Sequence, residues 1–304
     1  MRNYKHVIVV GIDGAGAFIK DADTPNFDSI FSNGAVTYSA LASNPTISAE
    51  CWGSMLLGVG PEIHKLTNAI VSTTPYPIDS QFPSLFRRIK EAMPEAEIGS
   101  YCDWNCITYG ILESNLNAAH DTARDTELTP IICEYIQEKK PAFLFIQFDS
   151  VDGAGHKNGY GSEKHLQRIN EVDELVNDVY KAAETAGIIE DTLFIVIADH
   201  GGTPFDGNGA SHGGWTDAEK LVTFAATGKT VQHCNIENMN IRDLAAIVLY
   251  AFNIKAPEFD EQGWTAQIPE EMFADPDLPA YRDISHLTGA APRRSKVQHT
   301  SELV

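Results

Sequence analysis

The 304-residue sequence has no long hydrophobic run. Its longest apolar stretches, such as HVIVVGI and AFLFIQF, are much shorter than the ~20 residues that a membrane-spanning helix needs. The chain opens on MRNYKHVIVVGIDG and enters a strand-like run at once, without the charged, apolar and small-residue segments of a secretion signal. We therefore expect a cytoplasmic protein with no membrane partner.

Cysteines are few, and no two form a CxxC pair. An odd number of scattered thiols favours reduced cysteines over a disulfide framework. Cys102 and Cys106 lie four residues apart in CDWNC, but no second pair accompanies them, so a structural zinc knuckle is not expected. The cysteines are Cys51, Cys102, Cys106, Cys133 and Cys234.

Basic residues are scarce. The sequence has 22 Lys and Arg against 42 Asp and Glu, which gives a formal net charge of -20. This balance repels polyanions, so duplex nucleic acid is not an expected partner. A small anionic substrate requires a local source of positive charge. Hydrophobic residues make up 43% of the chain, which is enough for a packed core.

Buried strands alternate with helices along the chain. Continuous apolar strands are typical of parallel pairing with both faces covered. We therefore expect an α/β fold, with a mostly parallel central sheet flanked by helices on both faces. The expected strands are 6–12, 97–102, 142–148, 192–198 and 221–227, and the expected helices are 84–93, 129–140, 162–187 and a late one within 240–252. Residues 1–283 are expected to form a single domain, and 284–304 a polar, loosely ordered tail.

Acidic and histidine side chains follow the three strongest strands. In α/β sheets, functional residues gather beyond the carboxyl ends of the strands, so these side chains are expected to meet. Grouped carboxylates repel one another unless a cation lies among them. The residues are Asp13 after the first strand, Asp149, Asp152 and His156 after the third, Asp199 and His200 after the fourth, and His212 in the loop GASHGGW.

This mixture of ligands favours zinc or a similar transition metal over magnesium or calcium. One zinc ion takes about four or five ligands, so a single ion could not use all the candidates. Two ions a few ångströms apart could share them, and such pairs clamp the attacking and leaving oxygens of phosphoryl transfer. Taken singly, each residue could also be an ordinary turn or loop residue.

A dinucleotide-binding loop is disfavoured at the first strand end. GIDGAGAF has Gly14 and Gly16 but lacks the third glycine of GxGxxG. Asp13 would also repel a phosphate held by the adjacent backbone amides.

The stretch NPTISAECWGSMLLGVGPEIH contains three hydroxyl residues, Thr46, Ser48 and Ser54. A hydroxyl just before a helix is often only an N-cap, and it can also be a nucleophile. The stretch by itself leaves both roles open.

These motifs, in this order, resemble those of the alkaline phosphatase superfamily, most closely its type I phosphodiesterase/nucleotide pyrophosphatase branch. The resemblance extends from His6 to about Gly228. It is carried by GIDG, a hydroxyl before a helix, LGVGPEIH, VDGAGHKNG, ADHGG and HGG. It implies an alkaline-phosphatase-like fold and two divalent metal ions, with zinc expected.

The resemblance also implies two ligand sets. One zinc would be held by Asp152, His156 and His212. The other would be held by Asp13, Asp199, His200 and the nucleophile's oxygen. The family nucleophile lies three residues after a proline, which from Pro45 gives Ser48, with Thr46 as the alternative. Two divalent ions would balance three carboxylates and a Ser48 alkoxide, so the loaded site could accept phosphate.

The function that the resemblance implies is hydrolysis of small phosphoesters or nucleotides through a phosphoserine at Ser48. Asn68 would donate to a phosphate oxygen. No arginine lies near the motifs, which favours a phosphodiesterase or nucleotide pyrophosphatase. A phosphomonoesterase of the same superfamily is an alternative, because Lys65 and Lys157 could supply positive charge. A metal-binding, non-catalytic homologue is another alternative.

Several positions depart from the family pattern. Lys65 follows His64 where the family usually has glycine, and AECW replaces a stretch that usually holds proline and asparagine. SAECW lacks the proline and arginine of a sulfatase motif, which disfavours sulfatase activity. The segment Asp103–Asp125 is expected to contribute to the substrate rim.

Overall fold

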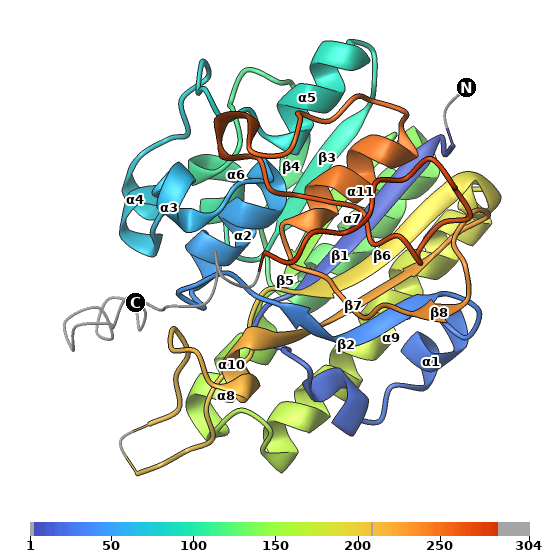
Figure 1. The fold of residues 1–304 in the computed structure, drawn as a ribbon. Helices are drawn as coiled ribbons and strands as arrows, with labels where there is room; N and C mark the ends of the chain where they lie inside the picture. The colour runs from blue at the N-terminus through green and yellow to red at the C-terminus, as the bar shows by residue number, and fades with distance from the viewer. Residues whose placement is uncertain (1–2, 208, 285–304) are drawn as a thin grey trace.

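A computed structural model describes residues 3–207 and 209–284 of the chain (Figure 1). Of the predicted polar tail, 284–304, only Ile284 belongs to these residues, and it is buried. The remainder of that prediction, 285–304, lies outside the described part. Among the helices of residues 3–207 and 209–284, none combines the length and the apolar composition of a bilayer span.

The strands of the described residues form one eight-stranded sheet in the order β4-β3-β5-β1-β6-β7-β2-β8. Pairing is parallel throughout except at β7, which runs antiparallel to both β6 and β2. The predicted mostly parallel sheet is therefore confirmed. The bounds are β1 His6–Ile12, β2 Ala35–Leu41, β3 Ile98–Cys102, β4 Ala119–Asp121, β5 Phe143–Phe148, β6 Thr192–Ala198, β7 Leu221–Thr227 and β8 Cys234–Asn235.

Helices cover both faces of the sheet, as predicted (Figure 1). On one side α1, α7 and α8 pack around the long helix α9, and on the other α2, α5 and α11 pack together. The bounds are α1 Pro25–Ile30, α2 Ser48–Leu57, α3 Pro61–His64, α4 Asn68–Thr73, α5 Leu85–Ala92, α6 Cys106–Gly110, α7 Asp125–Lys139, α8 Ser150–Asn158, α9 Glu163–Thr185, α10 Asp217–Lys220 and α11 Asp243–Ala251.

Helix α9 illustrates how the sequence sets an element. The Ser162 hydroxyl caps its start by accepting the His165 N–H at 3.3 Å. Its inward face is apolar at helical spacing, with Ile169, Val172 and Val176 buried. Beyond its end, Gly187 has φ 70°, a left-handed conformation that favours glycine.

Strands β5, β1 and β6 lie side by side at the centre of the sheet, and their side chains are almost entirely buried. Burying a Val, Ile or Phe side chain contributes roughly 1.5–3 kcal/mol, so these strands form a rigid base. Ile12 pairs in register with Phe148 on one side and with Ala198 on the other. All three strands therefore end at one level, and the residue after each is an aspartate.

Three local predictions need correction. The strand 221–227 is buried, but it is antiparallel rather than parallel. Helix α7 begins at Asp125, before the predicted 129, because Pro130 is accommodated inside the helix. The segment after β5 is the helix α8, which is missing from the predicted helices because Gly153 and Gly155 lower its helix propensity.

Candidate metal centre

The predicted ligands converge at the carboxyl edge of the central strands. Asp13, Asp149 and Asp199 follow β1, β5 and β6 directly, and β1 lies between the other two strands. Asp152 and His156 come from the first two turns of α8. Spaced four residues apart on a helix, these two side chains share one face. His212 arrives on the loop between β6 and α10.

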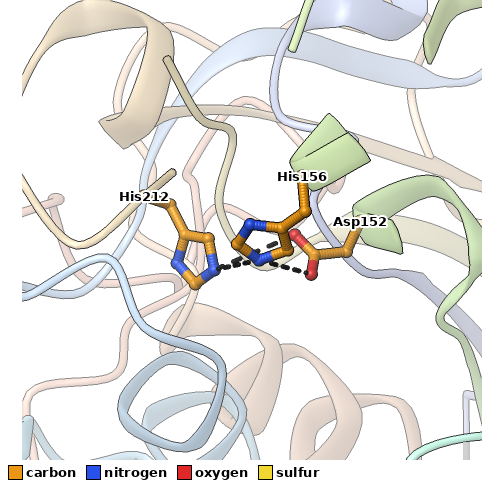
Figure 2. A group of neighbouring side chains, drawn as sticks. All are labelled: Asp152, His156 and His212. Carbon is orange, nitrogen blue, oxygen red and sulfur yellow. Dashed lines mark hydrogen bonds and ion pairs between the residues drawn. The ribbon is translucent and has the colours of Figure 1, made fainter. Parts of the chain in front are cut away.

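One cluster is formed by Asp152, His156 and His212, whose side chains point toward one another in Figure 2. His156 Nε2 lies 3.2 Å from Asp152 Oδ2 and 3.2 Å from His212 Nε2. One ligand atom from each residue lies within 4.8 Å of the other two. Three donors at this separation match the predicted ligand set of the first ion.

A second cluster forms around His200, deeper in the molecule. Its Nε2 atom lies 3.5 Å from Asp13 Oδ1, 3.2 Å from Asp199 Oδ2 and 3.2 Å from the Ser48 hydroxyl. These four residues are buried, with Asp199 and His200 fully so. Asp152 also comes within 4.8 Å of donors from Asp13 and His200, so its carboxylate connects the two clusters.

Backbone carbonyls orient all three histidines in the same way. His200 Nδ1 lies 3.0 Å from the Gly201 carbonyl, His212 Nδ1 lies 2.7 Å from that of Thr46, and His156 Nδ1 lies 3.3 Å from that of Ala210. A carbonyl oxygen can only accept, so each Nδ1 carries the proton. In the neutral rings every Nε2 lone pair then faces the site, which is the arrangement typical of metal-ligating histidines.

Neutral donors hold the carboxylate of Asp13. Its Oδ2 accepts from Trp52 Nε1 at 2.8 Å and from Gln147 Nε2 at 3.1 Å. The same Gln147 amide donates to Asp149 Oδ1 at 3.0 Å. These bonds use one oxygen of Asp13 and leave the other, Oδ1, directed at the His200 cluster.

Tyr160 holds Asp152 in a comparable way. Its hydroxyl donates to Asp152 Oδ1 at 2.5 Å, and its ring lies edge-on to His156 with 5.7 Å between centroids. A side-chain carbon added at Gly155 or Gly202 would collide with the Tyr160 ring, so both positions require glycine. The tyrosine is 2% exposed and closes the inner side of the first cluster.

Without a cation, ionisation of several buried groups in the two clusters is unfavourable. Burial raises the pKa of Asp13 well above its usual range, and the charges of Asp199 and Asp152 add to this. Burial likewise raises the pKa of Asp199. Burial opposes ionisation of Asp152, but the His156 hydrogen bond and His212 lower its pKa overall. Burial and the neighbouring His212 lower the pKa of His200.

These residues fit two divalent cations. Within the described chain, Asp13 Oδ1 and Asp199 Oδ2 are buried without a hydrogen-bond partner. Such orphaned oxygens are costly unless a cation binds them. The Nε2 atoms of His156 and His212 are 3.2 Å apart, where two lone pairs would repel. Imidazole and carboxylate donors together suit zinc or a similar transition metal.

Ser48 and Thr46 have clearly different surroundings. Ser48 is the first residue of α2, and Ile47 rather than Ser48 occupies the N-cap. Thr46 is fully buried, and its hydroxyl donates to the Gly214 carbonyl at 3.0 Å and accepts from the Gly213 N–H at 2.7 Å. Thr46 therefore anchors the loop that carries His212, whereas the Ser48 hydroxyl faces the His200 cluster.

Asn68 lies beside the start of α2. Its Oδ1 accepts the Ala49 backbone N–H at 2.9 Å. That bond uses the Ala49 amide and orients the Asn68 side chain so that its NH₂ group is available as a donor. Among the described residues, no acceptor for this NH₂ group is found.

The remaining predicted residues have other positions. Lys65 and Lys157 are exposed. The ends of the segment Asp103–Asp125 support the site from behind: the Trp104 N–H donates to Gln147 Oε1, and the Asp125 carboxylate accepts the Asp149 and Ser150 N–H groups. Sequence reasoning missed the supporting roles of Trp52, Gln147 and Tyr160. The spacing of Ser48 and Trp52, four residues on one helix, was the signal available.

Comparison with known proteins agrees with this geometry. The family model for type I phosphodiesterase / nucleotide pyrophosphatase matches residues 88–277, more than half of the chain. The matched range includes Asp152, His156, Asp199, His200 and His212. It begins after Asp13, Ser48 and Asn68.

Curated relatives are distant and much longer. GPI ethanolamine phosphate transferase 2 of Aspergillus fumigatus is 24% identical over 191 residues, which are 61% of this chain and 25% of that protein. The protein of the same name from Aspergillus oryzae is 32% identical over 88 residues, 29% of this chain and 10% of its own. The chain thus spans a quarter or less of these relatives.

Solved structures share the fold. Murine ectonucleotide pyrophosphatase / phosphodiesterase 5, as an inactive variant in complex with AMP, has a TM-score of 0.68 at 17% identity, covering 84% of this chain and 97% of its own. The 2-O GAG sulfatase BT1596 has a TM-score of 0.65 at 15% identity, covering 86% and 73%. At these identities the likeness establishes the alkaline-phosphatase-like architecture.

Proposed function

Since the chain belongs to the type I phosphodiesterase / nucleotide pyrophosphatase family, we propose that it is a two-metal hydrolase of phosphoric esters with Ser48 as its nucleophile. The substrate class is a small phosphodiester or nucleotide pyrophosphate. The family assignment supports phosphoester hydrolysis. The positions and contacts of individual side chains support the finer assignment.

The observation that carries the proposal is the convergence on Ser48. Its hydroxyl lies 3.2 Å from His200 Nε2, and that same nitrogen lies 3.5 Å and 3.2 Å from the orphaned oxygens of Asp13 and Asp199. A purely structural role at the start of a helix does not account for two buried carboxylates and an imidazole lone pair around this serine. A hydroxyl in such surroundings is placed to lose its proton and attack.

The arrangement differs from a serine hydrolase triad. In a triad, a carboxylate holds the Nδ1–H of the histidine whose Nε2 faces the serine. Here a backbone carbonyl takes the Nδ1–H of His200, and Asp13 and Asp199 both lie on the Nε2 side. Carboxylates on that side are available to bind a cation next to Ser48. This arrangement favours phosphoryl transfer over acyl transfer.

Two divalent cations, when bound, would lower the pKa of the Ser48 hydroxyl, neutralise phosphate charge and stabilise the leaving oxygen. Asp152, His156 and His212 would hold one of them. Asp13, Asp199, His200 and Ser48 Oγ would hold the other. We propose zinc for both.

The covalent chemistry takes two steps at Ser48. Its oxygen attacks phosphorus, the new Oγ–P bond forms and the bond from phosphorus to the leaving oxygen breaks. The leaving group departs and takes up a proton. Water then attacks the phosphorus on Ser48, the Oγ–P bond breaks, and a phosphate monoester leaves while one proton of the water returns to Ser48 Oγ.

Two features at the start of α2 would stabilise the oxygens of the reacting phosphate. Ser48 is at the helix N-terminus, where the aligned peptide dipoles favour negative charge. Asn68, fixed through the Ala49 amide, would direct its NH₂ group to a phosphate oxygen. Asn68 would then be a catalytic residue that touches substrate.

The donors around the site favour a diester. The carboxylates of Asp13 and Asp152 receive side-chain hydrogen bonds from neutral groups, Trp52, Gln147 and Tyr160. In the described chain, no lysine or arginine donates to a predicted ligand. A diester carries less charge than a monoester and needs less compensation. A monoester would need further positive charge, for which the exposed Lys65 and Lys157 are the candidates.

Metal analysis combined with kinetics on aryl phosphate mono- and diesters tests the proposal. We expect two ions per chain and faster turnover of the diester, abolished in Ser48→Ala. Ser54→Ala removes a hydroxyl on the same helix whose partners are the Glu50 carbonyl and His64 Nε2, and it is the matched control. Tight metal binding without hydrolysis of either ester class would instead support a non-catalytic, metal-binding homologue.

A further inference from the structure

A cavity of about 400 Å³ lies at the opposite end of α2 from Ser48. Its wall includes Val59, just beyond the end of that helix, together with Phe82, Arg87, Arg88 and Trp264. Ten helical residues extend ~15 Å, so the cavity is well separated from the metal centre. Its volume is within the range of pockets that bind small organic molecules.

The Arg88 guanidinium has no acceptor in this cavity. It lies over the Trp264 ring, 5.0 Å from the centroid, and its Nε is buried without a hydrogen-bond partner. In the described part of the chain, no group accepts from its other nitrogens and no carboxylate lies within 4.0 Å. The adjacent Arg87 is engaged instead, through Glu91 and through the Ile78 and Ser80 carbonyls.

Unused donors on a half-buried arginine are unfavourable. Arginine keeps its charge in proteins, so it cannot escape the penalty by losing a proton. Burial lowers the pKa of Arg88 in spite of the neighbouring Glu91. A ligand that brings oxygen acceptors to the other guanidinium nitrogens, which are not among the buried unpartnered atoms, would stabilise this charge.

Acidic residues of the cavity do not satisfy Arg88. Asp79 and Glu261 both line it. Glu261 Oε2 accepts the Glu258 N–H at 2.9 Å, which keeps it within its own turn. Together with Arg87 and Arg88 these acids leave the cavity formally neutral, in a chain whose net charge is -20. An anion is therefore repelled less here than over most of the surface.

The turn that borders the cavity is strained. Asp260 and Gln262 have φ values of 67° and 52°, in the left-handed region that non-glycine residues seldom adopt. Such conformations cost energy and often occur at ligand sites. The turn places Gln262, an amide with donors of its own, in the cavity wall.

We propose that this cavity is a second ligand site, which binds a small organic oxyanion on Arg88. The planar guanidinium matches a phosphate or carboxylate group with two parallel N–H···O bonds. The apolar part of the ligand would lie against Phe82, because the Trp264 ring is covered by Arg88 itself. This site is independent of the metals and of the proposed hydrolysis.

Calorimetric titration of the metal-loaded, full-length protein tests the site with two probes, phenylphosphonate and benzoate. Phenylphosphonate resists hydrolysis because its phosphorus is bonded to carbon. We expect at least one probe to show a saturable binding event that weakens tenfold or more in Arg88→Met, which keeps the apolar stem. Arg168→Met, at an exposed arginine paired with Glu171, should leave that event unchanged.

The two probes separate the sources of the anion. An Arg88-dependent event with phenylphosphonate alone assigns a phosphate group, and one with benzoate assigns a carboxylate. Arg88→Lys keeps the charge and loses the paired donors, so it should bind more weakly than the wild type even if Arg88→Met fails to fold. Identical isotherms in the wild type and the folded Arg88 variants would overturn the proposal.

Discussion

Trp52 and Asp13 join the helix of the proposed nucleophile to the end of the central strand: the Trp52 indole N–H donates to Asp13 Oδ2 at 2.8 Å. Trp52 lies one helical turn after Ser48, so both side chains are on the face of α2 that meets the sheet edge. The indole ring packs edge-on against Phe145 in β5, with 5.7 Å between centroids. The position of Ser48 relative to a candidate metal ligand is thus set by core packing.

Removal of this bond should weaken one ion selectively. Trp52→Phe keeps an aromatic ring in the core and deletes the donor to Asp13. Loss of a group that orients a metal ligand typically costs about 10–100-fold in affinity. We expect a loss of this size for the ion assigned to Asp13, Asp199 and His200, measured by competition with a chelating dye. Equal weakening of both ions would argue against a role specific to Asp13.

Tyr160→Phe provides the reciprocal case. It removes the hydroxyl that donates to Asp152 and retains the ring that packs on His156. The ion assigned to Asp152, His156 and His212 should weaken by a similar factor, while the other changes less. Tyr250→Phe, whose hydroxyl donates to Asp275 away from the site, is the control. Unchanged metal affinity in Tyr160→Phe would show that the hydroxyl has no orienting effect.

Chelation should lower both activity and thermal stability. Without cations, the buried carboxylates of Asp13 and Asp199 would face one another and the His200 lone pair, and the lone pairs of His156 and His212 would face each other. The melting temperature of the chelated protein should therefore fall, and it should recover when zinc is added back, as expected for a ligand that binds only the folded state. Calorimetry with and without chelator measures this shift. A fully active, metal-free protein would contradict the two-metal assignment.

A buried carboxyl that is not one of the candidate metal ligands should give a measurable pH dependence. Burial raises the pKa of Asp243 to about 7, although it accepts from the Asn240 N–H and the Tyr281 hydroxyl. The folded state then holds this proton more tightly than the unfolded state, so the contribution to stability is complete below about pH 4 and is lost as the pH rises toward 7. The difference is on the order of a few kcal/mol. Denaturant unfolding from pH 4 to 8 should show a decline that is smaller in Asp243→Asn, since burial also raises the pKa of Asp149 and Asp103. The same slope in both proteins would exclude Asp243 as its source.

Much of the central architecture could be predicted from the sequence because it depends on local hydrophobic runs. The bounds of β1 and β6 match the predicted 6–12 and 192–198. The convergence of the acidic residues that follow these strands was predicted by the rule that functional residues collect at strand ends. Strands β2, β4 and β8 were missed, because short or half-exposed strands lack a continuous apolar pattern. The direction of β7 was wrong, since a buried strand has the same composition in either orientation.

The supporting residues could not be predicted because their partners are remote in sequence. Trp52 and Asp13 are 39 residues apart, and the Thr46 hydroxyl bonds Gly214, 168 residues away. Two hydroxyls in PTIS look equivalent in the sequence. Only the fold shows that one anchors a distant loop and that the other faces the candidate metal ligands.

The choice between these two hydroxyls gives the sharpest prediction. Ser48→Ala should reduce turnover on the order of a thousand-fold or more, as expected for loss of a nucleophile. Most metal binding and the fold should survive, because Ser48 is not the N-cap of α2. Ser48→Thr should retain part of the activity, since it keeps an attacking oxygen while its added methyl group crowds a buried site.

Thr46→Ala should lose activity for a different reason. It removes the bonds to Gly213 and Gly214, so the loop should loosen and the ion held by His212 should bind more weakly. Excess zinc should then restore much of the activity of Thr46→Ala and none of that of Ser48→Ala. Rapid quenching with a labelled diester, followed by peptide mapping, should place the phosphate on Ser48 in the peptide from Pro45 to Trp52. Label on Thr46, or full turnover in Ser48→Ala, would transfer the nucleophile's role to the other hydroxyl.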